Sequence, residues 1–305
     1  MTQTILVPLD GTAVAARAIP YAATIARATG ASVLLLHTVP APAARRSPYH
    51  QLSAEPASAM LEAHAAALRQ QGVAVQTLVL TGEAVRWIVD VARVRDVALI
   101  VMARRSHGLF GTITEAVLAR TSAPILLVSD DTTFDGPERL LASPRLLVPL
   151  DGSAAAEEAL ALASNLASRL GGALVLLQAT APDAAATADL VAADGAPAPS
   201  AYLRDLVVRG AAMGTTVHFD VRPGEPAAAI EASGDEHDAA LIVMTTHCQG
   251  GPHRYALGRV SRAVLHKSRL PLLLIRPQTL GTPECLTGAW SGVAATMPGH
   301  ASAGW

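Results

Sequence analysis

The sequence predicts two tandem α/β domains, each built on a parallel β-sheet with helices on both faces. Two observations carry this prediction. The segment from Ile5 to Thr12, Ile-Leu-Val-Pro-Leu-Asp-Gly-Thr, returns from Leu146 to Ser153 as Leu-Leu-Val-Pro-Leu-Asp-Gly-Ser. Short apolar runs also alternate with longer alanine-rich stretches, which is the pattern of consecutive βαβ units. At 305 residues, the chain has room for two domains of about 150 residues each.

The repeat extends along both halves of the chain. Three further segments return in the same order with nearly constant spacing: Gly82-Glu83 as Gly224-Glu225, Ala98–Met102 as Ala240–Met244, and Ala123–Val128 as Leu270–Ile275. These matches predict a first domain over residues 1–129 and a second over residues 144–277. The Pro- and Gly-containing stretch 130–143 is expected to be a linker. The tail 278–305 lacks periodicity and is expected to be largely disordered.

Each half is expected to alternate five strands with four helices. The apolar runs of the first half predict strands at 5–9, 33–36, 97–102 and 125–128. They are apolar throughout, which is typical of parallel strands covered on both faces. Alanine favours helix, and the alanine-rich stretches predict helices at 13–29, 57–71, 84–94 and 113–121. The second helix of each half has the weakest signal, because it follows segments rich in Pro, Ala and Ser at 40–58 and 181–200.

The composition limits the classes of partner. The net charge is −2 and no long block of one sign occurs, so we expect no nucleic-acid partner. No apolar run approaches the roughly 20 residues that cross a bilayer, and no targeting segment precedes the first strand, so we expect no membrane partner. The two cysteines, Cys248 and Cys285, make no disulfide framework. Together these features predict a soluble protein of the cytoplasm.

Two aspartates end the first strand of each half, where a ligand site is expected. In doubly wound sheets, ligands bind beyond the carboxyl ends of the strands, at the point where the strand order reverses. Asp10 and Asp151 stand at this position, each followed by glycine and a hydroxyl residue. They could accept a hydrogen bond from a ligand. They could equally shape a tight turn before a helix whose first residue is capped by Thr12 or Ser153.

The loops after the fourth strands are the second candidate. Both run from a strand into a helix and contain glycine, so they could present backbone N–H groups and a helix N-terminus to an anion. The first loop ends in Gly111-Thr112, and the second in Gly258-Arg259. The signal is weak alone, because such loops often contain glycine for turn geometry.

Taken together, the markers resemble those of the universal stress protein family. They are Val-Pro-Leu-Asp-Gly-Ser/Thr after strand one, Val-Met closing strand four, and a proline that opens strand five, all in order and twice. The resemblance implies a flavodoxin-like sheet of order 3-2-1-4-5 in each half. It also implies pairing through the fifth strands, so we expect an intramolecular domain pair, and a homodimer stays open. Some members of the family bind ATP and others do not.

The resemblance also implies the positions of an adenine-nucleotide site in each half. In the first half these are Pro8, Asp10, Thr38, Met102, Ala103, Gly111, Thr112 and Ile113; in the second they are Pro149, Asp151, Ala179, Met244, Thr245, Gly258, Arg259 and Val260. ATP binders carry a glycine-rich loop directly after the strand-four methionine, and both halves depart from it. Thr245 and Cys248 replace the early glycines of the second half, and Arg259 replaces the final hydroxyl residue.

In the first half, Ala103 and Ser106 stand at the early glycine positions, and the loop is shorter. Met102 and Gly111 are nine positions apart, whereas Met244 and Gly258 are fourteen apart, so the first loop is five residues short. A shortened loop presents fewer N–H groups to a triphosphate. Arg259 could pair with phosphate instead. The sequence leaves ATP binding open and favours the second half for it.

No catalytic set is apparent, so the leading hypothesis is a non-catalytic stress-response protein gated by adenine nucleotide. A degenerate scaffold that binds partners but no nucleotide is the main alternative, and a nucleotide-hydrolysing enzyme is a weaker one. A phospho-acceptor receiver domain would need an acidic cluster and a lysine after strand five, where Ser129 and Arg276 stand. His247, Cys248 and His253 do not have the spacing of a metal site, so no metal is expected.

Overall fold

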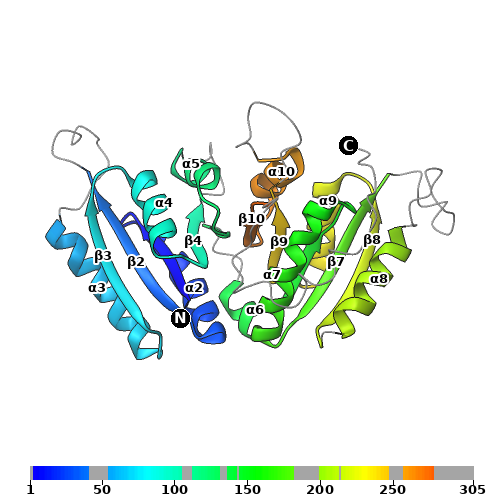
Figure 1. The fold of residues 1–305 in the computed structure, drawn as a ribbon, viewed down its shortest axis with the longest axis horizontal. Coiled ribbons are helices and arrows are strands. Elements are labelled where there is room, and N and C mark those ends of the chain that lie inside the picture. The colour runs from blue at the N-terminus through cyan, green and yellow to red at the C-terminus, as the bar shows by residue number, and fades with distance from the viewer. Residues whose placement is uncertain are drawn as a thin grey trace. The chain divides into compact units, whose positions relative to one another are not determined.

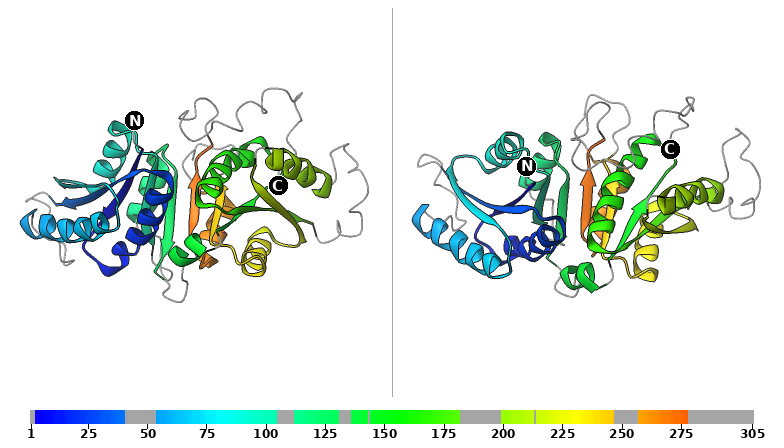
Figure 2. Two further views of the ribbon diagram at one scale, coloured as in Figure 1. Left: turned by 90° about the horizontal axis from the view of Figure 1, so that it is seen from below. Right: turned by 60° about the horizontal axis from the view of Figure 1, so that its bottom comes forward.

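A computed structural model describes residues 3–40, 54–104, 112–130, 136–142, 144–181, 199–212, 214–246 and 257–277 (Figures 1 and 2). The fold is α/β with predominantly parallel strands, as the sequence predicts. The described residues form two compact units. Residues up to Leu141 form the first, together with Arg269–Leu274, and the second comprises the rest of the described chain from Ala142. The predicted tail 278–305 lies outside the described residues.

The first unit contains the parallel sheet β3-β2-β1-β4-β5, which is the predicted order 3-2-1-4-5. Its elements are β1 (Thr4–Leu9), α1 (Ala13–Ala16), α2 (Ala18–Thr29), β2 (Ser32–Val39), α3 (Ala54–Gln70), β3 (Val75–Thr81), α4 (Ala84–Val94), β4 (Leu99–Arg104), α5 (Thr112–Arg120) and β5 (Ile125–Ser129). Right-handed crossovers place α2 and α3 on one face of the sheet and α4 on the other, as Figure 2 shows.

The second unit repeats this plan with the parallel strands β9-β6-β7-β8. The elements of the second half are β6 (Arg145–Pro149), α7 (Ala154–Leu170), β7 (Ala173–Thr180), α8 (Pro199–Ala212), β8 (Thr216–Pro223), α9 (Pro226–Glu236), β9 (Leu241–Thr245), α10 (Arg259–Lys267) and β10 (Leu272–Ile275). Strand β10 pairs antiparallel with β5, Leu273 opposite Leu126, and its contacts therefore place it with the first unit.

The first helix of the first half is interrupted at Arg17, whereas α7 is continuous. Arg17 keeps helical dihedral angles, φ −64° and ψ −19°. The interruption follows from Pro20, which has no N–H to donate to the carbonyl of Ala16 and whose ring crowds that carbonyl. Ala161 occupies the matching position of α7, so the hydrogen-bond ladder continues there. The sequence predicts one helix over 13–29, and the proline divides it.

The predicted linker contains a helix that the sequence pattern did not predict. Helix α6 spans Gly136–Ala142 and begins with glycine and proline, and proline suits the first turn of a helix. Leu140 of this helix is fully buried. The burial of one apolar side chain thus fixes a short helix in a stretch whose Gly and Pro suggest only a connection.

Both cores consist of Leu, Val, Ile and Ala, as a chain with 3% aromatic residues requires. Leu6, Leu35 and Ile100 are fully buried in the first unit, and Leu147 and Leu174 in the second. Burial on both faces explains why these strands are apolar throughout. Within the described ranges, none of the helices combines the length and the apolar character that crossing a membrane requires.

Candidate functional site

The strand order reverses at the same place in each half, and the predicted site lies at the carboxyl ends of the strands there. Strand β1 lies between β2 and β4, with Leu6 beside Ile100. Strand β6 lies between β7 and β9, with Leu147 beside Ile242. Because all these strands are parallel, the carboxyl ends of β1 and β4 lie at one edge of the first sheet. The carboxyl ends of β6 and β9 do the same in the second.

Asp10 shapes the turn between β1 and α1. One oxygen of its carboxylate, Oδ1, accepts hydrogen bonds from the backbone N–H and the hydroxyl of Thr12, at 2.9 and 2.6 Å. The same hydroxyl oxygen accepts a bond from the N–H of Ala15 at 3.2 Å and so caps the helix. Gly11 has φ 86°, which a residue with a side chain rarely adopts.

Asp151 shapes the matching turn between β6 and α7. Its Oδ1 accepts a hydrogen bond from the N–H of Ser153 at 3.0 Å, and the Ser153 hydroxyl caps the N–H of Ala156 at 3.1 Å. Both aspartates are exposed. For the second oxygen of either carboxylate, Oδ2, the described part of the chain offers no hydrogen bond. In both aspartates Oδ1 therefore shapes the turn before the helix, and Oδ2 could accept a hydrogen bond from a ligand.

Most of the remaining predicted positions line the strand ends. Met102 and Met244 are 7% and 6% exposed, so their side chains belong to the cores. The Thr245 side chain is also buried, and its carbonyl accepts a bond from the Ser261 hydroxyl at 3.2 Å. Four further positions are half-buried at strand ends: Pro8, Thr38, Ala103 and Ala179; Pro149 ends β6 in the same way.

Helices α5 and α10 begin at the predicted positions, Thr112 and Arg259. Gly258 is the N-cap of α10, and no side chain caps that end of the helix. Ile113 and Arg259 are exposed, and Val260 is half-buried. Gly111, Ser106, His247, Cys248 and His253 lie outside the described residues, so the conformation of both glycine-containing loops does too.

Arg259 places a positive charge at the first position of α10. Among the described residues, its guanidinium makes no hydrogen bond and no ion pair. It acts at longer range on Glu225, the N-cap of α9, whose pKa is lowered. The main cause is hydrogen bonding from the N–H groups of Ala227 and Ala228, and the charges of Lys267 and Arg259 add to it. A cation without a bonded partner at an uncapped helix N-terminus is well placed to meet an anion.

Two polar side chains beside the site did not enter the sequence prediction as ligand contacts. His37 in β2 is 3% exposed, and its Nδ1–H donates to the carbonyl of Leu9, one residue before Asp10, at 2.8 Å. Matching the two repeats pairs His37 with Gln178 of β7. Polar residues at the same position of two otherwise apolar strands were the signal available in the sequence.

The second half also carries a tyrosine–glutamate pair near Asp151. The Tyr202 hydroxyl, in the first turn of α8, donates to Glu157 Oε1 of α7 at 2.9 Å. Burial raises the pKa of Tyr202 well above its usual value, and the charges of Glu157 and Asp151 raise it further. Met60 and Ala16 occupy the matching positions of the first half, so this pair distinguishes the two sites.

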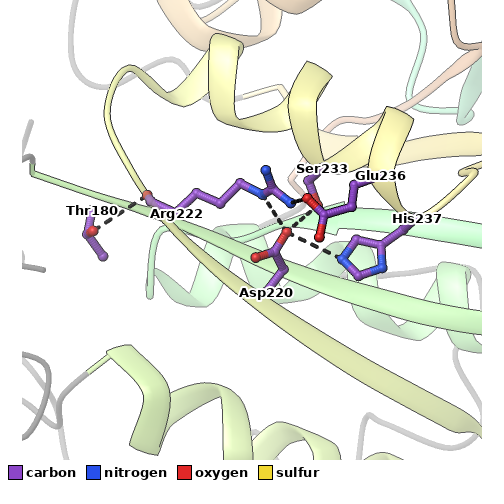
Figure 3. Close-up of polar contacts among 6 residues, drawn as sticks. All are labelled: Thr180, Asp220, Arg222, Ser233, Glu236 and His237. Atoms are coloured by element: carbon purple, nitrogen blue, oxygen red, sulfur yellow. Dashed lines mark hydrogen bonds and ion pairs between the residues drawn. The ribbon is translucent and has the colours of Figure 1, made fainter.

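A charged cluster fastens α9 to the edge strand β8 (Figure 3). Asp220 Oδ2 accepts hydrogen bonds from Arg222 at 2.6 Å and from the Ser233 hydroxyl at 2.8 Å, and lies 3.4 Å from His237 Nε2. Arg222 also pairs with Glu236. Burial acts to raise the pKa of the Asp220 carboxyl, but these bonds and charges outweigh it and lower the pKa. We assign the cluster a structural role.

Metal chemistry finds no support in the described ranges, where no group of three or more His, Cys, Asp or Glu side chains could hold an ion. Within the described ranges, one carboxylate oxygen of each aspartate after the first strand and, in the second half, the guanidinium at the start of α10 have no bonded partner.

Known proteins share the tandem organisation of this chain. The model of the universal stress protein family matches residues 1–129 and 143–276. A universal stress protein of Mycobacterium tuberculosis is 29% identical over 181 residues, which cover 56% of this chain and 57% of that relative. The chain thus covers little more than half the length of the curated relatives it matches.

Solved structures share the fold over most of the chain. A universal stress protein from Archaeoglobus fulgidus has a TM-score of 0.71 at 22% identity and covers 90% of this chain and 98% of its own. A Pseudomonas aeruginosa protein of unknown function has a TM-score of 0.66 at 17% identity, over 90% of this chain and 93% of its own. At these identities the structures compare folds only, whereas the family model matches both halves of the sequence. The chain belongs to the universal stress protein family.

Proposed function

We propose that this protein is a non-catalytic stress-response protein of the cytoplasm whose second half binds an adenine nucleotide. The observation that carries the proposal is the start of α10. Its N-cap, Gly258, provides no side-chain cap, and Arg259 at the first helical position has no bonded partner among the described residues. N–H groups without a side-chain cap and a guanidinium without a bonded partner among the described residues are proposed to form a receptor for phosphate oxygens.

Asp151 is proposed to hold the other end of the nucleotide. Its Oδ1 is fixed by the N–H of Ser153, so the carboxylate is oriented before any ligand arrives. Its Oδ2 can then accept a hydrogen bond from a ribose hydroxyl. The strand order places the turn after β6 beside the end of β9, so both ligand contacts belong to one edge of one sheet.

The first half provides less for a triphosphate. Thr112 stands where the second half has Arg259, and the loop from Met102 to Gly111 spans nine positions against fourteen in the second half. A shorter loop, and threonine in place of Arg259 at the start of the helix, predict weaker binding of phosphate groups there. The proposed ATP site is therefore single, and it lies in the second half.

Binding without turnover follows from the groups available. Hydrolysis of a phosphoanhydride requires a metal-holding carboxylate or a base that orients water. Asp151 is proposed to bind sugar, and neither requirement is met by another group in the part of the chain that the structure describes. We therefore expect the bound nucleotide to be released unchanged, so that its occupancy could control the binding of a partner.

The test begins with the nucleotide content of the purified protein, read by denaturing it and chromatographing the supernatant. ATP is then titrated into wild type and the variants Asp10→Ala, Asp151→Ala and Arg259→Ala. We expect affinity to fall about tenfold or more for Asp151→Ala and Arg259→Ala, because each removes a charged hydrogen-bonding partner. Asp10→Ala is the matched control and should bind as wild type does.

A scaffold that binds no nucleotide is the second candidate, and Thr245 favours it. Its buried side chain occupies the position at which the binders of this family carry a glycine after the strand-four methionine. Absence of ATP binding by folded wild type would support this alternative. Loss of binding only in Asp10→Ala would contradict the assignment of the site to the second half.

A further inference from the structure

The outer strands of the two halves, β3 and β8, each keep one backbone edge that no other strand covers in the described part of the chain. Successive residues of a strand direct their N–H and C=O groups to opposite edges. In β3, the N–H of Gly82 donates inward to Val39, and in β8 the N–H of Gly224 donates inward to Thr180. The residues that face outward are therefore the odd-numbered ones: Val75, Thr77, Val79 and Thr81 in β3, and Val217, Phe219, Val221 and Pro223 in β8.

Side chains cover the outer edge of β3 at both ends. The carbonyl of Val75 accepts a hydrogen bond from Nη2 of Arg69 in α3 at 3.3 Å. The carbonyl of Thr81 accepts one from Nε1 of Trp87 in α4 at 2.9 Å. Natural proteins protect edge strands from pairing with other chains, and charged or bulky side chains placed over the edge do this. The first half therefore has a protected edge.

The outer edge of β8 lacks this protection within the described residues. Matching the two repeats places Ala211 at the position of Arg69 and Ala229 at the position of Trp87, and an alanine side chain has no group that bonds to a carbonyl. Phe219 stands where β3 has Thr77, and it is 38% exposed. An open edge that carries an exposed aromatic side chain is a surface to which another strand can add.

The sequence of β8 is complementary to a second copy of itself. A twofold axis at Phe219 makes the two strands antiparallel, so Phe219 faces its own copy and Val217 faces Val221 of the second copy. All three are outward residues, so their N–H and C=O groups can form about six hydrogen bonds between the chains. Aromatic and β-branched side chains that face each other across two strands stabilise the pairing.

The other face of β8 matches in the same register. The exposed His218 lies opposite Asp220 of the second copy. Asp220 Oδ2 belongs to the charged cluster of Figure 3, whereas Oδ1 has no hydrogen bond among the described residues and can accept one from the imidazole. An axis one residue further along would set two Asp220 carboxylates against each other, which is unfavourable. The charges therefore select the axis at Phe219.

We propose that the outer edge of β8 is an interface through which two copies of this chain join their sheets, with Phe219 of each copy at the twofold axis. The contact involves one short strand from each copy. Because so small an interface is typical of transient association, we expect a dissociation constant of about 10–100 μM. The interface is independent of the nucleotide site proposed above, and each can fail without the other.

Analytical ultracentrifugation of the full chain over about 1–500 μM tests the association. Wild type should pass from monomer to dimer. Val221→Pro removes an outward N–H, which an edge strand tolerates, and should weaken the dimer about tenfold or more. Val79→Pro, its counterpart in β3, is the matched control and should leave the dissociation constant unchanged. If wild type stays monomeric, or if Val221→Pro dimerises as strongly as wild type does, the proposal is wrong.

Two surface substitutions keep the test independent of the proline. Phe219→Thr introduces the residue of β3, and His218→Glu sets a carboxylate against Asp220 of the second copy. Each should weaken the dimer several-fold, whereas His218→Lys should keep it within a few-fold of wild type. Circular dichroism of every variant establishes that it folds. Unchanged dimerisation of both Phe219→Thr and His218→Glu would overturn the assignment.

Cysteine crosslinking tests the register. The two cysteines of the chain are first replaced as Cys248→Ser and Cys285→Ser. Facing residues of an antiparallel pair lie about 5.5 Å apart, which suits a disulfide, so Phe219→Cys should give a covalent dimer on mild oxidation. Thr77→Cys is the matched control and should remain a monomer. Equal yields of dimer from the two variants would contradict an interface at β8.

Discussion

The two halves share a backbone in detail and differ in what lies against their edge strands. In the first half, Leu36 pairs with Leu78 in a largely apolar setting. In the second, Leu177 pairs with Asp220, which carries the charged cluster with Arg222. The same fold has thus been packed in two ways. The parallel sheet thus determines the positions of the side chains, and these side chains can change from apolar to ionic without altering the strand register.

Even an unusual backbone conformation is repeated. Asp96 and Asp238 both have positive φ angles, 48° and 49°, at the turns that follow α4 and α9. Aspartate tolerates this region better than most residues, and both turns require it. The backbone can therefore serve as a common frame, so a substitution in one half has a matched control in the other.

The largest effect is expected from exchanging a proline between the first helices. Ala161→Pro would remove the N–H bonded to Glu157 and press the ring against its carbonyl, in a helix that is otherwise continuous. Such a substitution destabilises a helix interior by about 3 kcal/mol or more. Pro20→Ala, its counterpart, should change stability little, because α2 already accommodates the break. Thermal unfolding of both variants checks this. Equally small effects of the two substitutions would mean that a proline at this position costs neither helix any stability.

The charged cluster should be next in size. Asp220→Leu introduces the residue of the first half but leaves Arg222 without one of its two carboxylate partners, and is expected to cost about 2 kcal/mol. The double variant Asp220→Leu/Arg222→Leu copies Leu78 and Leu80 and should recover most of that loss. Chemical denaturation of the three proteins measures it. A double variant that is less stable than Asp220→Leu would show that the ionic packing cannot be replaced by the apolar one.

The same cluster gives a pH dependence with a definite sign. The folded state lowers the pKa of Asp220, so the carboxylate contributes stability above the ordinary aspartate pKa of about 3.9. That contribution is lost as the pH falls through the lowered folded pKa. In acid, wild type should lose more stability than Asp220→Asn does. Parallel acid-denaturation curves for the two proteins would contradict the account.

A smaller effect separates two equivalent glycines. Gly82 has φ 139°, and a Cβ there would lie 2.8 Å from Trp87 Nε1, which donates to the Thr81 carbonyl at 2.9 Å. Gly224 has φ 123° and open space around it. Both glycine-to-alanine variants strain the backbone, but Gly82→Ala also displaces the indole and should cost about 1 kcal/mol more. Tryptophan emission and denaturation report both changes, and an equal cost at the two positions would exclude the contact with Trp87.

The smallest effect concerns the tyrosine that only the second half carries. Tyr202→Phe removes the bond to Glu157 and should destabilise the second unit by about 1 kcal/mol. Because burial and two carboxylates raise its pKa, Tyr202 should stay protonated when exposed tyrosines ionise. An absorbance titration of wild type and Tyr202→Phe should therefore agree at moderately alkaline pH. If the variant lacks a tyrosinate signal that wild type shows at this pH, then Tyr202 ionises as an exposed tyrosine does, and its raised pKa is refuted.

The repeat made the strands predictable, because two copies of every marker located them and the turns at Asp10 and Asp151, whereas the strand order followed from the resemblance to the universal stress protein family. Pro20 is visible in the sequence, but the alanine-rich pattern around it predicts one continuous helix. Helix α6 depends on the burial of Leu140, which no local pattern reveals. The cluster around Asp220 joins a strand to a helix end, and only the three-dimensional packing brings Ser233 and His237 to that carboxylate.

The candidate site was predicted in outline from Asp151 and Arg259, but its orphan acceptors were not. His37 and Gln178 lie in apolar strands, and a polar residue there could equally be satisfied within the core. Only the hydrogen-bond partners show that one atom of each is left over. Matching the repeats pairs the two positions, and the structure shows that each side chain has a buried atom without a hydrogen-bond partner.

The proposed difference between the halves, a phosphate receptor in the second and none in the first, is tested by the stoichiometry of ATP binding. Isothermal titration calorimetry on the full chain should give one ATP site of higher affinity per chain, lost in Arg259→Ala and unchanged in Thr112→Ala, its counterpart in the first half. Two equal sites per chain, or one site that survives Arg259→Ala and is lost in Thr112→Ala, would contradict the account.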